Sequence, residues 1–281
     1  MKSRALPLKP RVRKRRKKAG AKARLVRLWP TARSRRRVTR VLRRAPWLFR
    51  LLLAAAVLIA FWFPVNWIYQ VIRKPTELFF PVSGTLSKTA PETWRDYGPL
   101  FERYSTSLID PELLAALAQV EGSGNPVAQT YWRWSFKPSP FEVYRPASSA
   151  VGMYQITNGT FEEAKRYCIR AHAVIDSCGM SNLYYRVLPS HAVELTAAYL
   201  DRRVAAALGQ RRGGSVSRHQ LQELAAVIHL CGAGAGESFA RRGMRLTEGQ
   251  RCGDHAAQDY VARVAAAQRA FERLHVTSDA N

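Results

Sequence analysis

The first 50 residues contain no aspartate and no glutamate, although they hold 21 lysines and arginines. The remaining 231 residues hold 24 basic and 20 acidic side chains, so they account for only +4 of the formal net charge of +25. The basic character therefore belongs to an N-terminal tail and not to a globular domain. Such a tail can bind nucleic acid or anionic lipid, and the residues that follow it decide between the two.

Charged side chains are also missing from the 22 residues Leu51–Ile72. A helix of that length spans roughly 33 Å, which is enough to cross a bilayer. Aromatic side chains that suit membrane interfaces lie towards its ends, namely Trp47, Trp62, Trp67 and Tyr69. A basic block before a lone span predicts a cytoplasmic N-terminus, so we expect contact with anionic lipid and no binding of nucleic acid.

No small-residue cleavage site follows the apolar run, so the sequence predicts an uncleaved anchor and not a signal peptide. Prolines and a glycine interrupt any regular pattern in the next 20 residues, which favours a linker there. We therefore expect four segments. They are a basic disordered cytoplasmic tail (1–46), a transmembrane anchor (47–72), a linker (73–93) and a domain across the membrane (94–281).

Cysteine is scarce, and all four cysteines follow the apolar run: Cys168, Cys178, Cys231 and Cys252. An even number of cysteines in an oxidising compartment predicts disulfides, and three pairings are possible. We favour Cys168–Cys178 and Cys231–Cys252, because both close short local loops. A zinc site with a nearby histidine is the alternative, but the chain has no Cys-x-x-Cys pair. We therefore expect no metal and no other cofactor.

Strand-like alternation is scarce as well, and the chain shows no internal repeat. Helical patterns predominate in six stretches, approximately Trp94–Thr106, Pro111–Glu121, Asn158–Ala173, Ser190–Leu208, Ser217–Cys231 and Asp254–Leu274. The sequence thus predicts a mostly α-helical domain after a single N-terminal transmembrane helix.

One of these helices carries a carboxyl group on its apolar face. Asp110–Glu112 is typical of a helix start, and the Gly-Ser-Gly-Asn-Pro segment at 122–126 of a helix end. Leu113, Leu117 and Glu121 recur every fourth residue, so Glu121 projects from the apolar face. A carboxyl group there can retain its proton, as a general acid must. Alternatively, Glu121 points into solvent at a frayed helix end.

The order of Glu121 and the Ala-Val-Gly-Met-Tyr-Gln-Ile segment at 150–156 resembles the SLT-type lytic transglycosylases. These lysozyme-like enzymes cleave peptidoglycan, and their pattern is Glu-Ser followed by Gly-Ala-x-Gly-Leu-Met-Gln-Ile. The likeness covers roughly residues 100–270. It implies that a single glutamic acid protonates the glycosidic oxygen between N-acetylmuramic acid and N-acetylglucosamine. The same group then acts as a base while the muramyl 6-hydroxyl closes onto C1, which leaves a 1,6-anhydro end.

The resemblance also implies a set of substrate contacts. Gly152 would let the backbone and a sugar approach closely, and Met153 and Tyr154 would offer it apolar and aromatic surface. Gln155 would supply one amide for hydrogen bonding. Alternatively, the segment is only a turn that leads into the next helix. The predicted substrate-binding residues outside the aromatic stretch are Ser149, Gly152, Met153, Tyr154, Gln155 and His229.

Several positions depart from the family pattern. Gly122 replaces the serine that follows the acid, and Met153 and Tyr154 replace leucine and methionine. The family's Ala-Tyr-Asn-Ala-Gly segment corresponds to 227–232, which lacks the tyrosine and the asparagine. His229 either substitutes for that tyrosine or is a packed core histidine. A goose-type lysozyme-like hydrolase and a non-catalytic peptidoglycan-binding assembly protein are therefore the alternative functions.

The stretch between Glu121 and Gly152 is about twice the length usual in the family and is rich in aromatic residues. We favour a glycan groove in which Trp132 and Trp134 stack on sugars. A partner-docking lobe and additional core are the alternatives. Together these features predict a single-pass inner-membrane protein of a Gram-negative-type cell, with its catalytic domain in the periplasm. Its expected partners are peptidoglycan glycan strands, the inner membrane and a cell-envelope protein complex.

Overall fold

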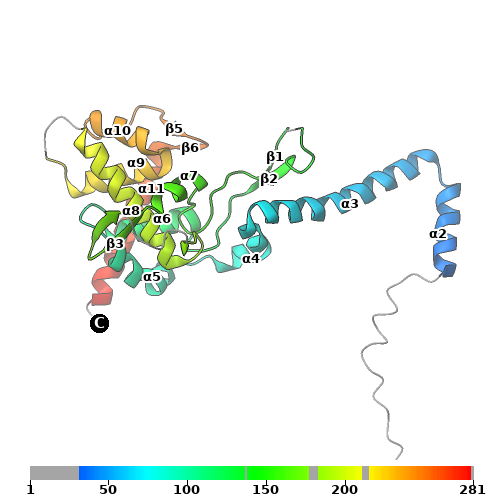
Figure 1. Ribbon diagram of the computed structural model, residues 1–281, viewed down its shortest axis with the longest axis horizontal. Helices are drawn as coiled ribbons and strands as arrows, with labels where there is room; N and C mark the ends of the chain where they lie inside the picture. Colours follow the sequence, from blue (N-terminus) through cyan, green and yellow to red (C-terminus); the bar gives the residue numbers. More distant parts are fainter. Residues whose placement is uncertain (1–31, 137, 177–182, 211–214, 280–281) are drawn as a thin grey trace, which may run out of the picture. The chain divides into compact units, whose positions relative to one another are not determined.

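The structure is a computed structural model that describes residues 32–136, 138–176, 183–210 and 215–279 (Figure 1). Contacts divide the chain into two units, residues 1–64 and 65–281. Helices predominate among the described residues of both units, as the sequence predicts, and the strands found there form short two-stranded hairpins.

In the first unit, the described residues form helix α2 (Ala32–Arg44) and most of helix α3 (Trp47–Arg73). The most apolar 18-residue window of α3 has a mean hydropathy of 2.2, and the helix is long and apolar enough to cross a membrane. Pro64 lies inside α3 and does not end it. The predicted apolar span is therefore one continuous helix.

The second unit is built around helices whose bounds are α5 (Ala90–Tyr104), α6 (Pro111–Gly122), α7 (Asn158–Ala164), α8 (Pro189–Gly209), α9 (Arg218–Cys231), α10 (Ala233–Arg241) and α11 (Ala257–Asp279). Helix α6 packs against α5 and α11, and Figure 1 shows these helices gathered in one body. The side chains of Leu113–Ala118 are all fully buried. A helix that is apolar on every side belongs in the core, so α6 is the central helix of this domain.

The two ends of α6 follow from its sequence. Pro111 occupies the first turn, where its missing N–H costs nothing. The Asp110 side chain makes no capping hydrogen bond and instead accepts two hydrogen bonds from Arg218, at 2.7 and 2.8 Å. At the other end, Ser123 and Gly124 both have positive φ angles, and this left-handed backbone stops the helix.

A β-hairpin replaces the second half of the helix predicted at Asn158–Ala173, which is therefore wrong beyond Ala164. Strands β3 (Tyr167–Arg170) and β4 (Ala173–Asp176) pair antiparallel, and the two residues between them, Ala171 and His172, have φ angles of 47° and 62°. Positive φ at both loop residues is the geometry of a tight hairpin turn. The N–H of Ile169 also donates to buried Glu194 at 3.0 Å, which fixes β3 against α8.

The predicted linker at 73–93 is partly ordered structure. It holds two 3-10 helices, η2 (Pro75–Phe79) and η3 (Gly84–Leu86), with the short helix α4 (Phe80–Ser83) between them, and α5 begins within it at Ala90. Glu77 is fully buried, and its carboxylate pairs with Lys74 at 2.9 Å. The prolines thus sit at helix starts and do not produce irregular chain.

The aromatic stretch forms a second hairpin, in which β1 (Trp132–Trp134) pairs with β2 (Tyr144–Pro146). The last two turns of α3 are fastened to it, because Asn66 donates to the carbonyl of Tyr144 at 2.8 Å and Gln70 to that of Phe141 at 2.6 Å. Residues 66–73 of α3 therefore belong to the globular unit, and the helix that remains for a membrane ends near Val65.

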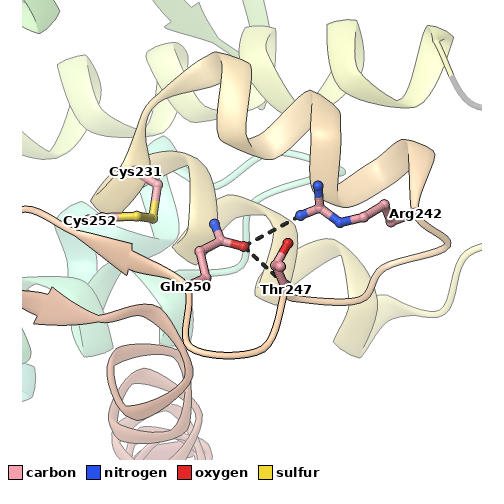
Figure 2. The surroundings of a disulfide bond; sticks show 5 residues. All are labelled: Cys231, Arg242, Thr247, Gln250 and Cys252. Carbon is pink, nitrogen blue, oxygen red and sulfur yellow. Dashed lines mark hydrogen bonds between the residues drawn. A yellow bond between two sulfur atoms is a disulfide. The ribbon is translucent and has the colours of Figure 1, made fainter.

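A disulfide joins Cys231, the last residue of α9, to Cys252 in β5 (Arg251–Cys252), with 5.2 Å between the Cα atoms (Figure 2). The loop between them holds α10 and a turn in which Gln250 accepts hydrogen bonds from Arg242 and from the N–H of Thr247 (Figure 2). Strand β5 pairs with β6 (His255–Ala256), so α11 begins at Ala257, three residues later than predicted. Cys168 is disulfide-bonded too, but its predicted partner, Cys178, lies outside the described residues.

Candidate active site

Glu121 lies in the last turn of α6, and its carboxylate faces two polar side chains from other helices. The hydroxyl of Tyr260, on α11, donates a hydrogen bond to Oε1 of Glu121 at 2.5 Å. Nε2 of His229, on α9, is 3.6 Å from the same oxygen. Only 18% of the Glu121 side chain is exposed, so the glutamate does not point freely into solvent.

Tyr260 is 2% exposed, and it is not among the residues that the sequence predicts for the site. Burial, reinforced by the charge of Glu121 and the hydrogen bond to it, raises the pKa of Tyr260 well above its usual value. The phenol therefore stays protonated and serves as a donor to Glu121. The sequence does contain a signal for Tyr260. The buried stripe of α11 consists of Ala257, Tyr260, Val264 and Phe271, and of these only Tyr260 carries a polar group.

His229 is held close to Glu121 in a neutral state. Burial lowers the pKa of His229, and the opposing effects of the Glu121 charge and a hydrogen bond with the Tyr154 backbone are smaller. The distance of 3.6 Å is too long for a hydrogen bond to Glu121. His229 is thus both a packed histidine and a neighbour of the acid. Its side chain is 12% exposed and borders a cavity of about 50 Å³ with Gln155, Thr157 and Tyr199.

Gly122 explains one departure from the family pattern. A Cβ atom at this position would lie 2.8 Å from Cα and 2.9 Å from the carbonyl oxygen of Met153. Real Cβ atoms essentially never approach backbone atoms so closely. The end of α6 therefore touches the backbone of the 150–156 segment directly, and only glycine fits between them.

Gly152 does not open the backbone to a sugar in the way that we predicted. Its φ angle is 83°, which favours glycine, and a Cβ atom there would lie 2.5 Å from the carbonyl oxygen of Arg186. The nearest atoms are thus those of the chain itself. Glycine is required here for a tight turn and for packing against residue 186.

Met153 and Tyr154 are both 0% exposed, so the prediction that they offer surface to a sugar ring is wrong. Both belong to the main hydrophobic core, where their apolar surface is removed from water by the surrounding helices. The segment is short and apolar without a clear period, and such a run cannot reveal which side chains turn inward.

Gln155 and Ser149 chiefly hold their own loops. The Gln155 amide donates to the carbonyls of Ala128, at 3.1 Å, and Gly152, at 2.9 Å. Ser149 Oγ accepts from the N–H of Asn158 at 3.1 Å and lines a pocket different from the cavity beside His229. Gln155 reaches that cavity, whereas the described contacts do not bring Ser149 to Glu121.

Trp132 and Trp134 lie on β1, and their described contacts are not with Glu121. The indole N–H of Trp132 donates to Glu77 at 3.0 Å, and its ring lies 5.3 Å from that of Tyr144. Trp134 lies 4.8 Å from the Tyr144 ring and is 61% exposed. The structure therefore joins the hairpin to the η2 segment, while helices α6, α9 and α11 supply the surroundings of Glu121.

The chemistry that these surroundings allow is proton transfer. A carboxyl group can give a proton to a sugar oxygen or take one from it, and the phenol of Tyr260 can hold that carboxyl group in place. Among the described residues, no group of three or more histidine, cysteine, aspartate or glutamate side chains could hold a metal ion.

Residues 99–226 match the family model of the transglycosylase SLT domain. The matched range runs from within α5 to within α9, and it contains Glu121 and the 150–156 segment. His229 and Tyr260 lie beyond its end. A comparison with curated proteins finds no match to the chain.

Proposed function

We propose that Glu121 is the single catalytic acid and base of this chain. The premise is that the chain belongs to the SLT-type lytic transglycosylases, which are lyases that act on peptidoglycan. The contact between Glu121 and Tyr260 carries this proposal, because it holds one oxygen of a partly buried carboxyl group in a fixed direction. The described contacts of Glu121 are with a tyrosine and a histidine, whereas ordinary glycosidases pair two carboxyl groups.

In the first step, Glu121 gives its proton to the glycosidic oxygen as the bond from C1 of the muramyl residue to that oxygen breaks. In the second step, the carboxylate takes the proton of the muramyl 6-hydroxyl while its oxygen bonds to C1. The proton returns to Glu121, a 1,6-anhydro end forms, and no water is consumed. The Tyr260 hydroxyl stabilises the carboxylate between the two steps, since hydrogen bonds to charged acceptors are the strong ones.

Analysis of the sugar ends tests this function. We expect the full chain, purified in mild detergent, to release fragments with 1,6-anhydromuramyl ends from isolated sacculi, as measured by mass spectrometry. Reducing ends would instead favour the goose-type lysozyme-like hydrolase. Binding to sacculi without any release of fragments would favour the non-catalytic assembly protein.

Tyr260→Phe is expected to lower kcat about tenfold or more and to leave KM nearly unchanged. A hydrogen bond to a charged group contributes roughly 1.5–3 kcal/mol, and KM should change little because the phenol is buried. The measurement is steady-state cleavage of a soluble glycan strand. Tyr154→Phe is the matched control, because that tyrosine is fully buried and its hydroxyl has no hydrogen-bond partner among the described residues. Equal kcat in the two variants would contradict a positioning role for Tyr260.

The anchoring of the domain is also part of the proposal. Helix α3 has the length and apolar character of a span, and the basic residues precede it. We expect a periplasm-dependent reporter fused after Asn281 to be active and a cytoplasm-dependent one to be silent. The reverse pattern would place the domain on the side that lacks peptidoglycan and would reject the location.

The aromatic hairpin supplies a further proposed contact with glycan or with an envelope protein. Trp134 suits stacking on a sugar because its side chain is largely exposed even though its ring packs against Tyr144, whereas Trp132 is half-buried and donates to Glu77. Loss of sacculus binding in Trp134→Ala would support the glycan groove. Normal binding by the purified variant, combined with a defect in cells, would support partner docking.

A further inference from the structure

A pocket of about 270 Å³ lies away from Glu121, between the end of α3 and the chain that follows β2. Four cationic side chains line it, and no aspartate or glutamate does. The lining consists of Gln70, Arg73, Lys74, Pro75, Thr76, Arg145, Pro146, Ala147, Ser148, Ser149, Asn158 and Arg186. Its composition points to an anionic ligand.

Two of these cations are compensated by carboxylates outside the pocket lining. Arg73 pairs with Glu142 at 2.6 Å, and Lys74 pairs with buried Glu77 at 2.9 Å. Lys74 also donates to the carbonyl of Ala150 at 3.0 Å, which closes one wall of the pocket. These contacts shape the pocket and offset the charge of Arg73 and Lys74. The excess positive charge of the pocket therefore belongs to Arg145 and Arg186.

Arg145 and Arg186 form no ion pair among the described residues. Arg186 donates to the carbonyls of Ser149 and Ile156, at 3.0 and 2.7 Å, which satisfies hydrogen bonding without neutralising its charge. Burial lowers the pKa of Arg186 by more than the charge of Glu162 raises it, so a bound anion would restore the stabilisation that the Arg186 charge has lost. Nε of Arg145 is buried and has no hydrogen-bond partner in the described part of the chain. Two guanidinium groups thus offer charge to a ligand.

The surface next to the pocket is apolar. Pro75 and Thr76 line the pocket and begin η2, and the chain that continues from them exposes five large apolar side chains, Leu78, Phe79, Phe80, Val82 and Leu86. On the other side, the pocket is bounded by the last turn of α3, the helix that is apolar enough to cross a membrane. Basic groups beside exposed apolar side chains at the end of a span suit contact with a lipid surface, because apolar burial and attraction to anionic lipid act together there.

We propose that this pocket binds the phosphodiester group of an anionic phospholipid, with Arg145 and Arg186 facing the phosphate and the 78–86 segment lying against the acyl chains. Arginine suits this role because its planar fork can donate two hydrogen bonds to one phosphate. The proposal goes beyond cleavage, since none of the lining residues is a described neighbour of Glu121. A bound lipid would hold the catalytic domain down on the membrane surface.

The test uses the full chain in mild detergent and measures retained lipid by native mass spectrometry. We expect the protein to retain phosphatidylglycerol in preference to phosphatidylcholine. Arg145→Gln should weaken this retention about tenfold, and Arg145→Lys, which keeps the charge, should weaken it less. Arg133→Gln is the matched control, because Arg133 lies opposite Arg145 in the same hairpin but does not line the pocket.

Three results would overturn the proposal. They are unchanged retention in Arg145→Gln, an equal loss in Arg133→Gln, and displacement of the lipid by inorganic phosphate or soluble muropeptides at equal concentration. Melting temperatures of all variants confirm that they are folded. Sacculus cleavage by Arg145→Gln is expected to remain normal, so failure of lipid binding and failure of the proposed catalytic function can be told apart.

Discussion

Glu121→Gln is expected to lower the rate of sacculus cleavage by roughly 10²–10⁴-fold, the usual contribution of a general acid and base. Glutamine has nearly the same volume, and its carbonyl oxygen can still accept the hydrogen bond from Tyr260. It cannot donate a proton to the glycosidic oxygen and take one back from the 6-hydroxyl. The loss therefore concerns chemistry and not packing, and the melting temperature should change little.

The measurement is the release of soluble fragments from sacculi at saturating substrate. Glu223→Gln is the matched control, since it removes one carboxylate from α9, where Glu223 lies 3.7 Å from exposed His219. The control should cleave normally. Comparable activity in Glu121→Gln and Glu223→Gln would remove Glu121 from the mechanism.

Gly122→Ser, which restores the residue usual in the family, is expected to destabilise this protein by about 1–3 kcal/mol, the typical cost of overpacking. The new Cβ atom would lie 2.8 Å from Cα of Met153, and backbone atoms cannot move aside as a flexible side chain can. Relief requires separation of α6 from the 150–156 segment. That movement displaces Glu121, so cleavage should fall as well.

Thermal or denaturant unfolding measures the effect, which at this size should lower the Tm by several degrees. Gly159→Ser is the matched control, because a Cβ atom at Gly159 would have no atom within 4 Å. A Gly122→Ser variant with unchanged Tm and higher activity would mean that the close contact with Met153 does not exist in the folded protein.

Local signals in the sequence were sufficient to predict several helices nearly to the residue. Helix α6 starts with a proline in its first turn and ends at residues with positive φ. Helix α9 starts after a serine cap and also ends at a residue with positive φ. The β3–β4 hairpin was missed because Ala171 and His172 form its turn, and neither is one of the glycine, asparagine or aspartate residues that usually mark a two-residue hairpin. Local sequence patterns therefore do not predict a turn that is formed by residues uncommon in turns of that type.

The site was predicted only in part, for a different reason. Glu121 follows from helical spacing and from the resemblance, but Tyr260 lies 139 residues further along the chain and reaches it through the packing of α11 on α6. Met153 and Tyr154 were assigned to the substrate and are instead core residues, since composition alone does not give the direction of a side chain. Tertiary contacts that connect distant segments decide both cases.

The disulfide between Cys231 and Cys252 bears on when the side chains around Glu121 are fixed in place. Cys231 lies two residues after His229, and Cys252 lies eight residues before Tyr260, so the bond ties together the two segments that flank Glu121. Such bonds form and persist mainly in oxidising compartments. With the domain in the periplasm, as proposed above, the bond would form after export, and a chain still in the reducing cytoplasm would lack this restraint.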